Sequence, residues 1–553
     1  MNPMPAAVAR AFAVALACAA ALVPDEGIAQ VSFDCVTPAT PSLVAPVVLG
    51  NGSAGSVTTA QVQQALDAGG PIRLDVGVST LVLGTTLRVT RATTLDLGGA
   101  TLSGGHVRRV IEVQNPANQT YAFTLSHGSI ADGSTPTASG AGLYKATGGP
   151  WQAVTLRFFD VRFTGNHAIA SAQDDGGGAL YVVGAAEVAV VRGQFDGNSG
   201  SNGGAFYSLG SKRVNLYDSV FTGNHATGSG GNPGNGGNGG AIGVDGDARF
   251  LNLCRIRLID NEANAFGGGL FTVTYSNASH TRLQDSTVQG NTSSAADKLA
   301  GGAYIQGSPI AISGSTFRDN DANGYAGLAL FGYGGVLEGS ISNSTFVGNL
   351  ARGGLGGAMA IQAASALTLQ NLTIAHNAAP CAGCFAAGIA NDSGASLTLR
   401  NVLFEDNVGG NAVQPMGDVA SRRERCRQPA MAAGASRSGA GRNGRRSGNR
   451  VRESQSRRPR GERRSDRDDG VAARQPGDRR WIDCRCTGDR PARRAARRRG
   501  RHRRVRTPAR SDLPQRFRAL TSRLRPEQPG ATLQAALRCF RLRSIRTHCE
   551  ENA

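Results

Sequence analysis

The chain has 553 residues and a formal net charge of +19, from 59 Lys and Arg against 40 Asp and Glu. The charge is divided unevenly, because residues 1–415 hold 20 basic and 26 acidic residues whereas residues 416–553 hold 39 and 14. All 39 basic residues of the second segment are Arg, whereas a segment that binds a phosphate backbone accepts Lys and Arg alike. The composition therefore argues against a nucleic-acid partner and divides the chain into two unlike segments.

Residues 1–29 have the features of a secretory signal peptide. Arg10 precedes an apolar run over residues 11–23, and the small residues Gly27 and Ala29 form a cleavage site. The run is shorter than the roughly 20 residues that span a bilayer as a helix. We therefore expect no transmembrane span and predict export to the extracellular space or the outer-membrane surface.

Residues 31–80 are predicted to form an N-terminal cap with a short helix. Thr58 and Thr59 can N-cap a helix over residues 60–66, in which Val62 and Leu66 lie one turn apart, and Gly69 ends it. A cap is needed because the first coil of a stack otherwise exposes an unpaired strand edge. A helix followed by Gly-Gly and a short strand resembles the start of pectate-lyase-like β-helices.

A repeat of about 29 residues organises the middle of the chain. An apolar residue stands three places before an Asn, as Phe221 does before Asn224, and a glycine-rich loop then leads to Gly-Gly-Ala at residues 239–241. Short alternating runs between turn residues, at a fixed period, predict a solenoid of short strands. The signature asparagines are Asn166, Asn198, Asn224, Asn261, Asn291, Asn320, Asn349, Asn377 and Asn407.

Stacked coils explain each part of the repeat. Strands of successive coils lie roughly 4.8 Å apart, so equivalent side chains stand above one another. The residues equivalent to Phe221 should stack in the core, and each signature Asn should hydrogen-bond to the next as a structural ladder. Gly-Gly permits positive φ where the chain re-enters a strand. We predict an all-β, single-stranded right-handed parallel β-helix over residues 81–415.

The pairing of F-x-x-N with G-G-A-[I/L/V] over residues 163–407 resembles the repeat of chlamydial polymorphic outer-membrane proteins and of bacterial secreted β-helix proteins. Two copies depart from it, because Ala326-Gly327-Leu328 replaces Gly-Gly-Ala in one and another has Ala387-Gly388. The resemblance implies a pectate-lyase-like solenoid that works in adhesion or surface interaction. We expect a monomer that meets an unknown surface ligand or glycan.

Acidic residues in the repeats give no catalytic pattern. Glycoside hydrolysis needs two carboxylates that face one cleft, and the adjacent acidic pairs are Asp174-Asp175 and Glu405-Asp406, in a loop and a turn. We therefore predict no catalytic residues, no metal site and no cofactor. A polysaccharide lyase or glycoside hydrolase on the same fold is the alternative, because parallel β-helices host both.

Four cysteines lie in residues 31–415, namely Cys35, Cys254, Cys381 and Cys384. The spacing of the last two fits half a zinc site, a redox motif or a local disulfide. A structural zinc needs a second pair nearby, and a thioredoxin-type motif needs a following helix. Neither is visible in the sequence, so we favour a Cys381–Cys384 disulfide in an exposed loop.

The repeat is lost in residues 416–553, which we interpret as translated out of frame. In the next reading frame, residues 428–433 allow N-L-Q-W-P and residues 465–482 allow P-T-x-T-M-A-L-L-P-G-S-P-A-I-D-A-G, with further strings at 487–497 and 501–507. In this order the strings resemble the C-terminal region of bacterial β-helix proteins of the choice-of-anchor Q type. We predict a frameshift near codons 410–425 and a disordered, Arg-rich tail.

Overall fold

The computed structural model describes residues 35–135, 138–145, 151–169, 172–231, 235–246, 250–362, 366–384, 386–391 and 397–410, and the backbone of two strands at 419–421 and 480–485. All of these residues belong to the first of two units, which ends at Gly488. The predicted signal peptide lies outside the described residues. So does the predicted out-of-frame tail, apart from the two backbone strands.

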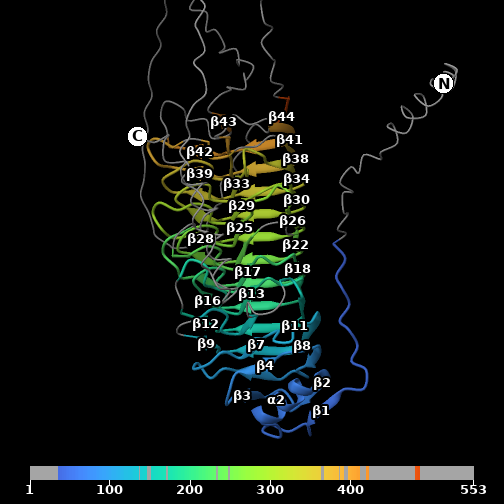
Figure 1. The fold of residues 1–553 in the computed structure, drawn as a ribbon. Helices are drawn as coiled ribbons and strands as arrows, with labels where there is room; N and C mark the ends of the chain where they lie inside the picture. Colours follow the sequence, from blue (N-terminus) through green and yellow to red (C-terminus); the bar gives the residue numbers. More distant parts are fainter. Residues whose placement is uncertain are drawn as a thin grey trace, which may run out of the picture. The chain divides into compact units, whose positions relative to one another are not determined.

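Helix α2 (Thr59–Ala68) closes the first coil of the stack, beside strands β1 (Val47–Gly50) and β2 (Gly70–Asp75) (Figure 1). Its N-cap is Thr58, whose hydroxyl accepts the N–H of Gln61 while the Gln61 side chain accepts the N–H of Thr58. Val62 and Leu66 are buried against the core. The helix begins one residue earlier and ends two residues later than the span expected from the sequence.

Three parallel sheets, here named A, B and C, run along the coils (Figure 1). A typical coil contributes one strand to sheet B, two strands separated by a bend to sheet A, and a two-residue strand to sheet C. Phe221 of β19, for example, pairs with Phe195 of the preceding coil and Leu258 of the next. The fold is the right-handed parallel β-helix that the repeat predicts.

The strands of sheet A begin before residue 80, the predicted end of the cap. Sheet A contains β1, β2, β3 (Thr80–Val82), β5 (Thr93–Asp96), β6 (Thr101–Ser103), β8 (Tyr121–Ala131), β11 (Val154–Thr164), β14 (Glu187–Val191), β15 (Gln194–Asp196), β18 (Arg213–Tyr217), β19 (Val220–Thr222), β22 (Phe250–Cys254), β23 (Arg257–Ile259), β26 (His280–Gln284), β27 (Thr287–Gln289), β30 (Ile310–Ser313), β31 (Thr316–Arg318), β34 (Glu338–Ser342), β35 (Thr345–Val347), β38 (Ala366–Ala375), β41 (Leu397–Glu405) and β44 (Arg480–Arg485). Among these, β44 pairs antiparallel with β41.

Sheets B and C complete each coil. Sheet B contains β4 (Leu87–Val89), β7 (Ile111–Val113), β10 (Leu143–Lys145), β13 (Leu180–Val183), β17 (Phe206–Leu209), β21 (Ile242–Asp245), β25 (Leu270–Val273), β29 (Ala303–Gln306), β33 (Leu328–Phe331), β37 (Met359–Gln362), β40 (Ile389–Asn391) and β43 (Val419–Ser421). Sheet C contains β9 (Ser134–Thr135), β12 (His167–Ala168), β16 (Ser199–Gly200), β20 (His225–Ala226), β24 (Glu262–Ala263), β28 (Thr292–Ser293), β32 (Asp321–Ala322), β36 (Leu350–Ala351), β39 (Ala378–Ala379) and β42 (Val408–Gly409).

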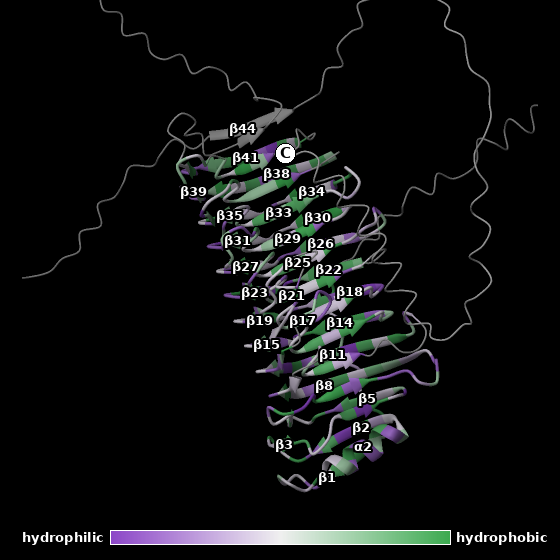
Figure 2. Cartoon of the chain, turned by 60° about the vertical axis from the view of Figure 1, so that its left-hand side comes forward, coloured by the Kyte–Doolittle hydropathy of each residue, from purple (hydrophilic) through white to green (hydrophobic). Residues whose placement is uncertain are grey.

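The core is a continuous apolar column inside the coils. The Phe163 and Phe195 rings stack with centroids 4.8 Å apart, and Phe195 and Phe221 stack at 4.3 Å. Phe317 and Phe346 repeat the arrangement further along, at 4.7 Å. Inward and outward side chains alternate along each strand, so apolar and polar residues alternate along sheet A (Figure 2). The inner layer fixes the fold and leaves the outward side chains for function.

Candidate functional site

The signature asparagines lie in the buried turn between sheets A and C. From Asn166 to Asn377, each Nδ2 donates to the Oδ1 of the next Asn at 2.8–3.0 Å. Asn291, which is fully buried, also donates to the carbonyl of Leu258 at 2.9 Å, while its Oδ1 accepts the N–H and Nδ2 of Asn261. Both N–H groups and both lone pairs of this amide are used, so the ladder serves the fold.

A second ladder, built from serines, was missed in the sequence. Ser286 accepts the N–H of Ile256 through its hydroxyl, and its own N–H donates to Ser315 Oγ at 3.2 Å. The N–H of Ser315 donates in turn to Ser344 Oγ at 3.1 Å. Each of these serines stands two places before the signature apolar residue, and Ser219 does the same. That fixed offset is the signal that could have revealed the ladder.

Two disulfides join the four cysteines considered above. Cys381 and Cys384 are bonded within one loop, with Cα atoms 5.1 Å apart. Cys35 and Cys254 are bonded across 219 residues, with Cα atoms 5.8 Å apart. No sequence motif points to the second bond, because Cys35 stands outside the repeat and only the folded coils bring it beside β22.

The Cys35–Cys254 bond fixes residues 35–46, here named the N-terminal strap, along the outside of the coils (Figure 1). Arg255 donates to the Cys35 carbonyl at 2.7 Å and to the Thr37 hydroxyl at 2.6 Å. Further along the strap, Arg192 donates to the Thr40 hydroxyl at 2.8 Å. The strap therefore makes polar contacts with two coils before it reaches β1.

The strap binds to a column of outward residues at the bend within sheet A, one from each coil. These residues, here named the charged column, are His127, Asp160, Arg192, Asp218 and Arg255, all with φ between 50° and 55°. Arg192 contacts both carboxylate oxygens of Asp160, at 2.6 and 2.7 Å, and Arg255 contacts both of Asp218, at 2.5 and 3.1 Å. These hydrogen bonds lower the pKa of Asp160 and that of Asp218.

A row of polar side chains crosses the outer face of sheet A beside this column. Asn215, Asn252 and Arg282 are in register on β18, β22 and β26 and are here named the outer row. Asn215 Nδ2 donates to Glu187 Oε1 at 2.8 Å, and Asn252 Nδ2 donates to Asn215 Oδ1 at 2.7 Å. Asn252 is 5% exposed, and its Oδ1 accepts no hydrogen bond among the described residues. The chain of hydrogen bonds from Glu187 through Asn215 thus ends at Asn252, in a buried acceptor without a donor among the described residues.

A cation–aromatic stack borders the outer row. The Arg213 guanidinium lies 5.1 Å from the centre of the Phe250 ring, and the His280 imidazole stacks on that ring at 5.1 Å. Burial, with the nearby Arg282 guanidinium, lowers the pKa of His280. Arg157 lies 3.5 Å from Glu187, the carboxylate that also accepts from Asn215. Arginine therefore outnumbers carboxylate on this part of the face.

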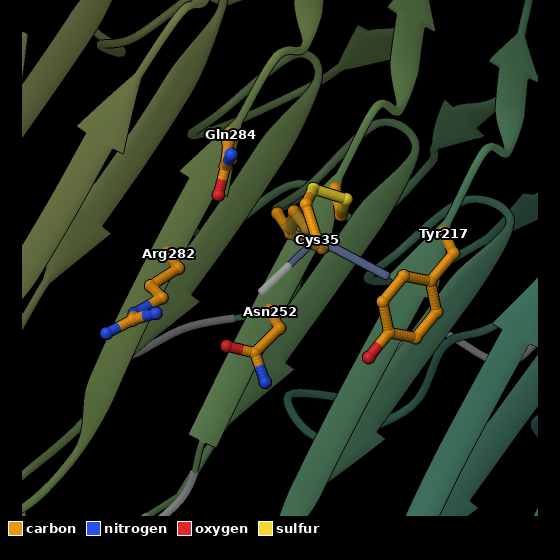
Figure 3. Close-up of a pocket in the computed structure, with 7 residues that line it drawn as sticks. Cys35, Tyr217, Asn252, Arg282 and Gln284 are labelled. Carbon is orange, nitrogen blue, oxygen red and sulfur yellow. A yellow bond between two sulfur atoms is a disulfide. The ribbon is translucent and has the colours of Figure 1, made fainter. Parts of the chain in front are cut away.

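The outer row and the strap line a small pocket of about 20 Å³, which is partly open to solvent. Figure 3 shows the Asn252 amide between the Arg282 guanidinium and the Tyr217 ring, with the disulfide beside them. Burial raises the pKa of Tyr217. The pocket is lined by Cys35, Tyr217, Asn252, Leu253, Cys254, Arg282 and Gln284.

The outer face of sheet B carries aromatic rings that are covered. Tyr181 lies between Tyr144 and Tyr207, with ring centroids 5.6 and 5.7 Å away. Tyr181 and Tyr207 are buried, and the Tyr181 hydroxyl donates to the Asp174 carbonyl at 2.7 Å. The loop that contains Asp174 is thus fastened over this part of the face.

The structure does not bring the acidic pairs considered in the sequence together. Asp174 and Asp175 precede β13, whereas Glu405 ends β41 and Asp406 follows it, in one of the last described coils. Asp175 accepts the Ser139 hydroxyl at 3.1 Å and the Ala172 N–H at 2.9 Å. The described residues also hold no group of three His, Cys, Asp or Glu side chains that could bind a metal.

Comparison with known proteins gives a family model and one solved structure. Residues 271–417 match the family model described as "Right handed beta helix region". No curated protein gives a significant match to the chain. The crystal structure of PfbA, a surface adhesin of Streptococcus pneumoniae, is similar with a TM-score of 0.34 and 12% identity, over 66% of this chain and 93% of that chain. No helix in the described residues has the length and apolarity to cross a bilayer. The protein is an all-β, right-handed parallel β-helix.

Proposed function

We propose that the protein is exported and acts as a non-catalytic surface protein that binds an extracellular ligand on the outside of its β-helix. The outer row carries this proposal. Its amides and guanidinium come from rigid neighbouring strands, and hydrogen bonds between coils orient Asn215 and Asn252 before any ligand arrives. Such preorganisation reduces the entropy that binding costs. Adhesion or another surface interaction is the role that a fixed outer face of this kind supports.

The Cys35–Cys254 disulfide supports export. Disulfides persist in oxidising compartments and are rare in the cytosol. This bond fastens the strap to a coil far along the chain, and a second bond joins Cys381 and Cys384. The signal-peptide features of residues 1–29 agree with this location, which we propose to be the extracellular space or the outer-membrane surface.

The same proposal includes the origin of the repeats and of the tail. The F-x-x-N and G-G-A units support kinship with polymorphic outer-membrane-type repeats, and the strings in the next reading frame support a frameshift after the last unit at Asn407. The nucleotide sequence across codons 410–425 tests the second point. An uninterrupted frame in independent reads would contradict it.

Binding and cleavage assays on the full chain test the proposed function. We expect the purified oxidised protein to bind cells or extracellular polysaccharide and to leave pectin- and alginate-like polymers at their original length. Release of new reducing or unsaturated ends would contradict the proposal in favour of a polysaccharide hydrolase or lyase. Alkylation of Cys35, Cys254, Cys381 and Cys384 in the native protein before reduction would contradict the export argument.

A further inference from the structure

We propose that two copies of the protein associate end to end through β1 and form a symmetric dimer, in place of the monomer expected from the sequence. The inference rests on the cap and the first coils, and it is independent of the ligand-binding role proposed above. Strand β1 (Val47–Gly50) lies at the lower end of the coils in both views (Figures 1 and 2).

The outer edge of β1 has no partner strand among the described residues. On its inner side β1 pairs parallel with β2, from Val47 opposite Ile72 to Gly50 opposite Asp75, and no other described strand pairs with it. Helix α2 covers the interior of the first coil but does not complete the hydrogen bonds of a strand edge. Such an edge presents N–H and C=O groups that another strand can bind.

Apolar side chains are uncovered at the same edge. Val47 is in register with Ile72, so both side chains lie on the core face of sheet A. Ile72 is fully buried, whereas Val47 is 55% exposed and Val48, on the opposite face, is 53% exposed. Of the ten exposed large apolar side chains in the described residues, six lie between residues 44 and 107. A core-facing side chain left open beside a free strand edge indicates a contact surface.

The edge carries no charge that would keep two copies apart. Residues 35–66 contain no Asp, Glu, Lys, Arg or His. Edge strands that remain single are commonly protected by charged side chains, Lys above all. A neutral, apolar strand of this kind selects a neutral, apolar partner strand, and β1 of a second copy is one.

The N-terminal end of the chain cannot cover β1. Cleavage at the predicted signal site leaves residues 30–34 before Cys35, and five extended residues span at most about 18 Å. Cys35 is bonded to β22, the seventh strand from β1 in the order β2, β5, β8, β11, β14, β18, β22. At roughly 4.8 Å per strand this distance is about 34 Å.

The opposite end of sheet A is occupied, because β44 pairs antiparallel with β41 there. A second copy therefore cannot add its β1 to β41 and start a head-to-tail filament. Pairing of β1 with β1 uses the same surface on both copies and closes as a dimer with a two-fold axis.

The two-fold axis determines which side chains meet. An axis normal to sheet A makes the two β1 strands antiparallel and keeps the core face of both copies on one side. Residues of the same face must then stand opposite each other. The register that pairs most of β1 places Val48 opposite the partner's Val48 and Val47 opposite the partner's Leu49. This register covers Val47 and continues sheet A from one copy into the other.

Sedimentation of the oxidised full chain tests the association. We expect a concentration-dependent mass of two chains, with a dissociation constant that is unchanged between about 0.1 and 1 M NaCl, because no charges meet. Val48→Lys places two like charges opposite each other and should raise the dissociation constant about a hundredfold. Val82→Lys changes the same residue type, 59% exposed on β3, and as the matched control should stay within about twofold of the wild type.

Cysteine cross-linking tests the register. Opposite residues of an antiparallel pair have Cα atoms about 4.5–5.5 Å apart, which a disulfide can span. We expect Val48→Cys to form a disulfide between the two substituted positions, identified by mass spectrometry, and Val82→Cys to form none.

A mass of one chain at every concentration up to about 100 μM would overturn the inference. So would a dimer that weakens as salt rises and survives Val48→Lys, because that behaviour assigns the contact to the Arg-rich segment 416–553. A disulfide from Val48→Cys to a cysteine of that segment would replace the second copy with the chain's own tail. Circular dichroism and thermal melting check that each variant folds.

Discussion

The β-helix has two columns of turn residues, the asparagine ladder and the charged column. Both pair polar side chains between successive coils, but they do so in different ways. The asparagine ladder is buried and made of one residue type, so each amide is both donor and acceptor to its neighbours. The charged column is partly exposed and alternates Asp with Arg, so each carboxylate pairs with one guanidinium. A ladder of identical amides can continue through any number of coils, whereas each ion pair joins one Asp to one Arg and does not extend to further coils.

Because each ion pair needs only one Asp and one Arg, the Arg side chain can also bind the strap. Each of Arg192 and Arg255 grips its Asp with two nitrogen atoms and also donates to a strap hydroxyl. The charged column thus fastens residues from outside the repeat, which the self-sufficient ladder does not. We infer that the ladder determines the stability of the coils and that the charged column determines the position of the strap.

The largest expected effect comes from breaking the ladder. Asn291→Leu removes the acceptor for Asn261 and the donor to Asn320, so buried polar groups lose their partners. We expect the free energy of unfolding to fall by about 3–5 kcal/mol in chemical denaturation. The control is Asn371→Gly in an exposed turn with φ of 54°, which should cost less than about 1 kcal/mol. Equal losses in the two variants would contradict a special role for the buried column.

The second largest expected effect is a difference in the free energy of unfolding between variants that lack one or the other disulfide. The double variant Cys35→Ser/Cys254→Ser releases a bond across 219 residues, and we expect it to lower the free energy of unfolding by about 2–4 kcal/mol. Cys381→Ser/Cys384→Ser opens a loop with a separation of 3 residues and should cost less, because a short loop constrains the unfolded chain less. Denaturation of the two double variants side by side measures the difference. The reverse order of stabilities would contradict a structural role for the strap.

Loss of one ion pair should act on the strap more than on the coils. Arg255→Gln removes the contacts to Asp218, Thr37 and the Cys35 carbonyl. We expect faster deuterium uptake by the strap peptide, equivalent to about 1 kcal/mol, with little change in the core strands. Arg318→Gln, which removes a surface contact to the adjacent Asp319, is the control. Uptake that rises equally in both variants would show that the strap does not depend on Arg255.

The smallest effect concerns pH. Hydrogen bonds from Arg192 and Arg255 hold the pKa values of Asp160 and Asp218 below that of an unfolded Asp, which is about 3.9. Because the folded pKa values are lowered, the stabilisation is present above about pH 4 and is lost as pH falls through the folded values. Strap exchange, corrected for its intrinsic pH dependence, should therefore increase below about pH 4 and stay constant between pH 5 and 7. The double variant Asp160→Asn/Asp218→Asn should remove this pH dependence, and an unchanged profile would assign it to other groups.

The sequence predicts what recurs in every coil. Phe195 and Phe221 stack as expected because the same residue type returns at the same phase, and this pattern fixed the fold class. The outer row gave no such signal, since Asn215, Asn252 and Arg282 are separated by 37 and 30 residues and differ in type. Because the loops between these residues differ in length, their spacing in the sequence does not show that they are in register. The strand pairing shows it. The Cys35–Cys254 bond was missed for a related reason, because one partner lies outside the repeat.

Because the asparagine ladder keeps the same register from coil to coil, the number of coils can change while the contacts within each remaining coil stay the same. Asn291 and Asn320 occupy equivalent places 29 residues apart, and each contacts only its immediate neighbours. Excision of residues 291–319 would place Asn320 directly after Gly290 and against Asn261, with every remaining coil unchanged. Unequal crossing-over between such units could therefore shorten or lengthen the protein in steps of about 4.8 Å per coil. Its reach could change by recombination while the strap, the pocket and the first coils kept their structure.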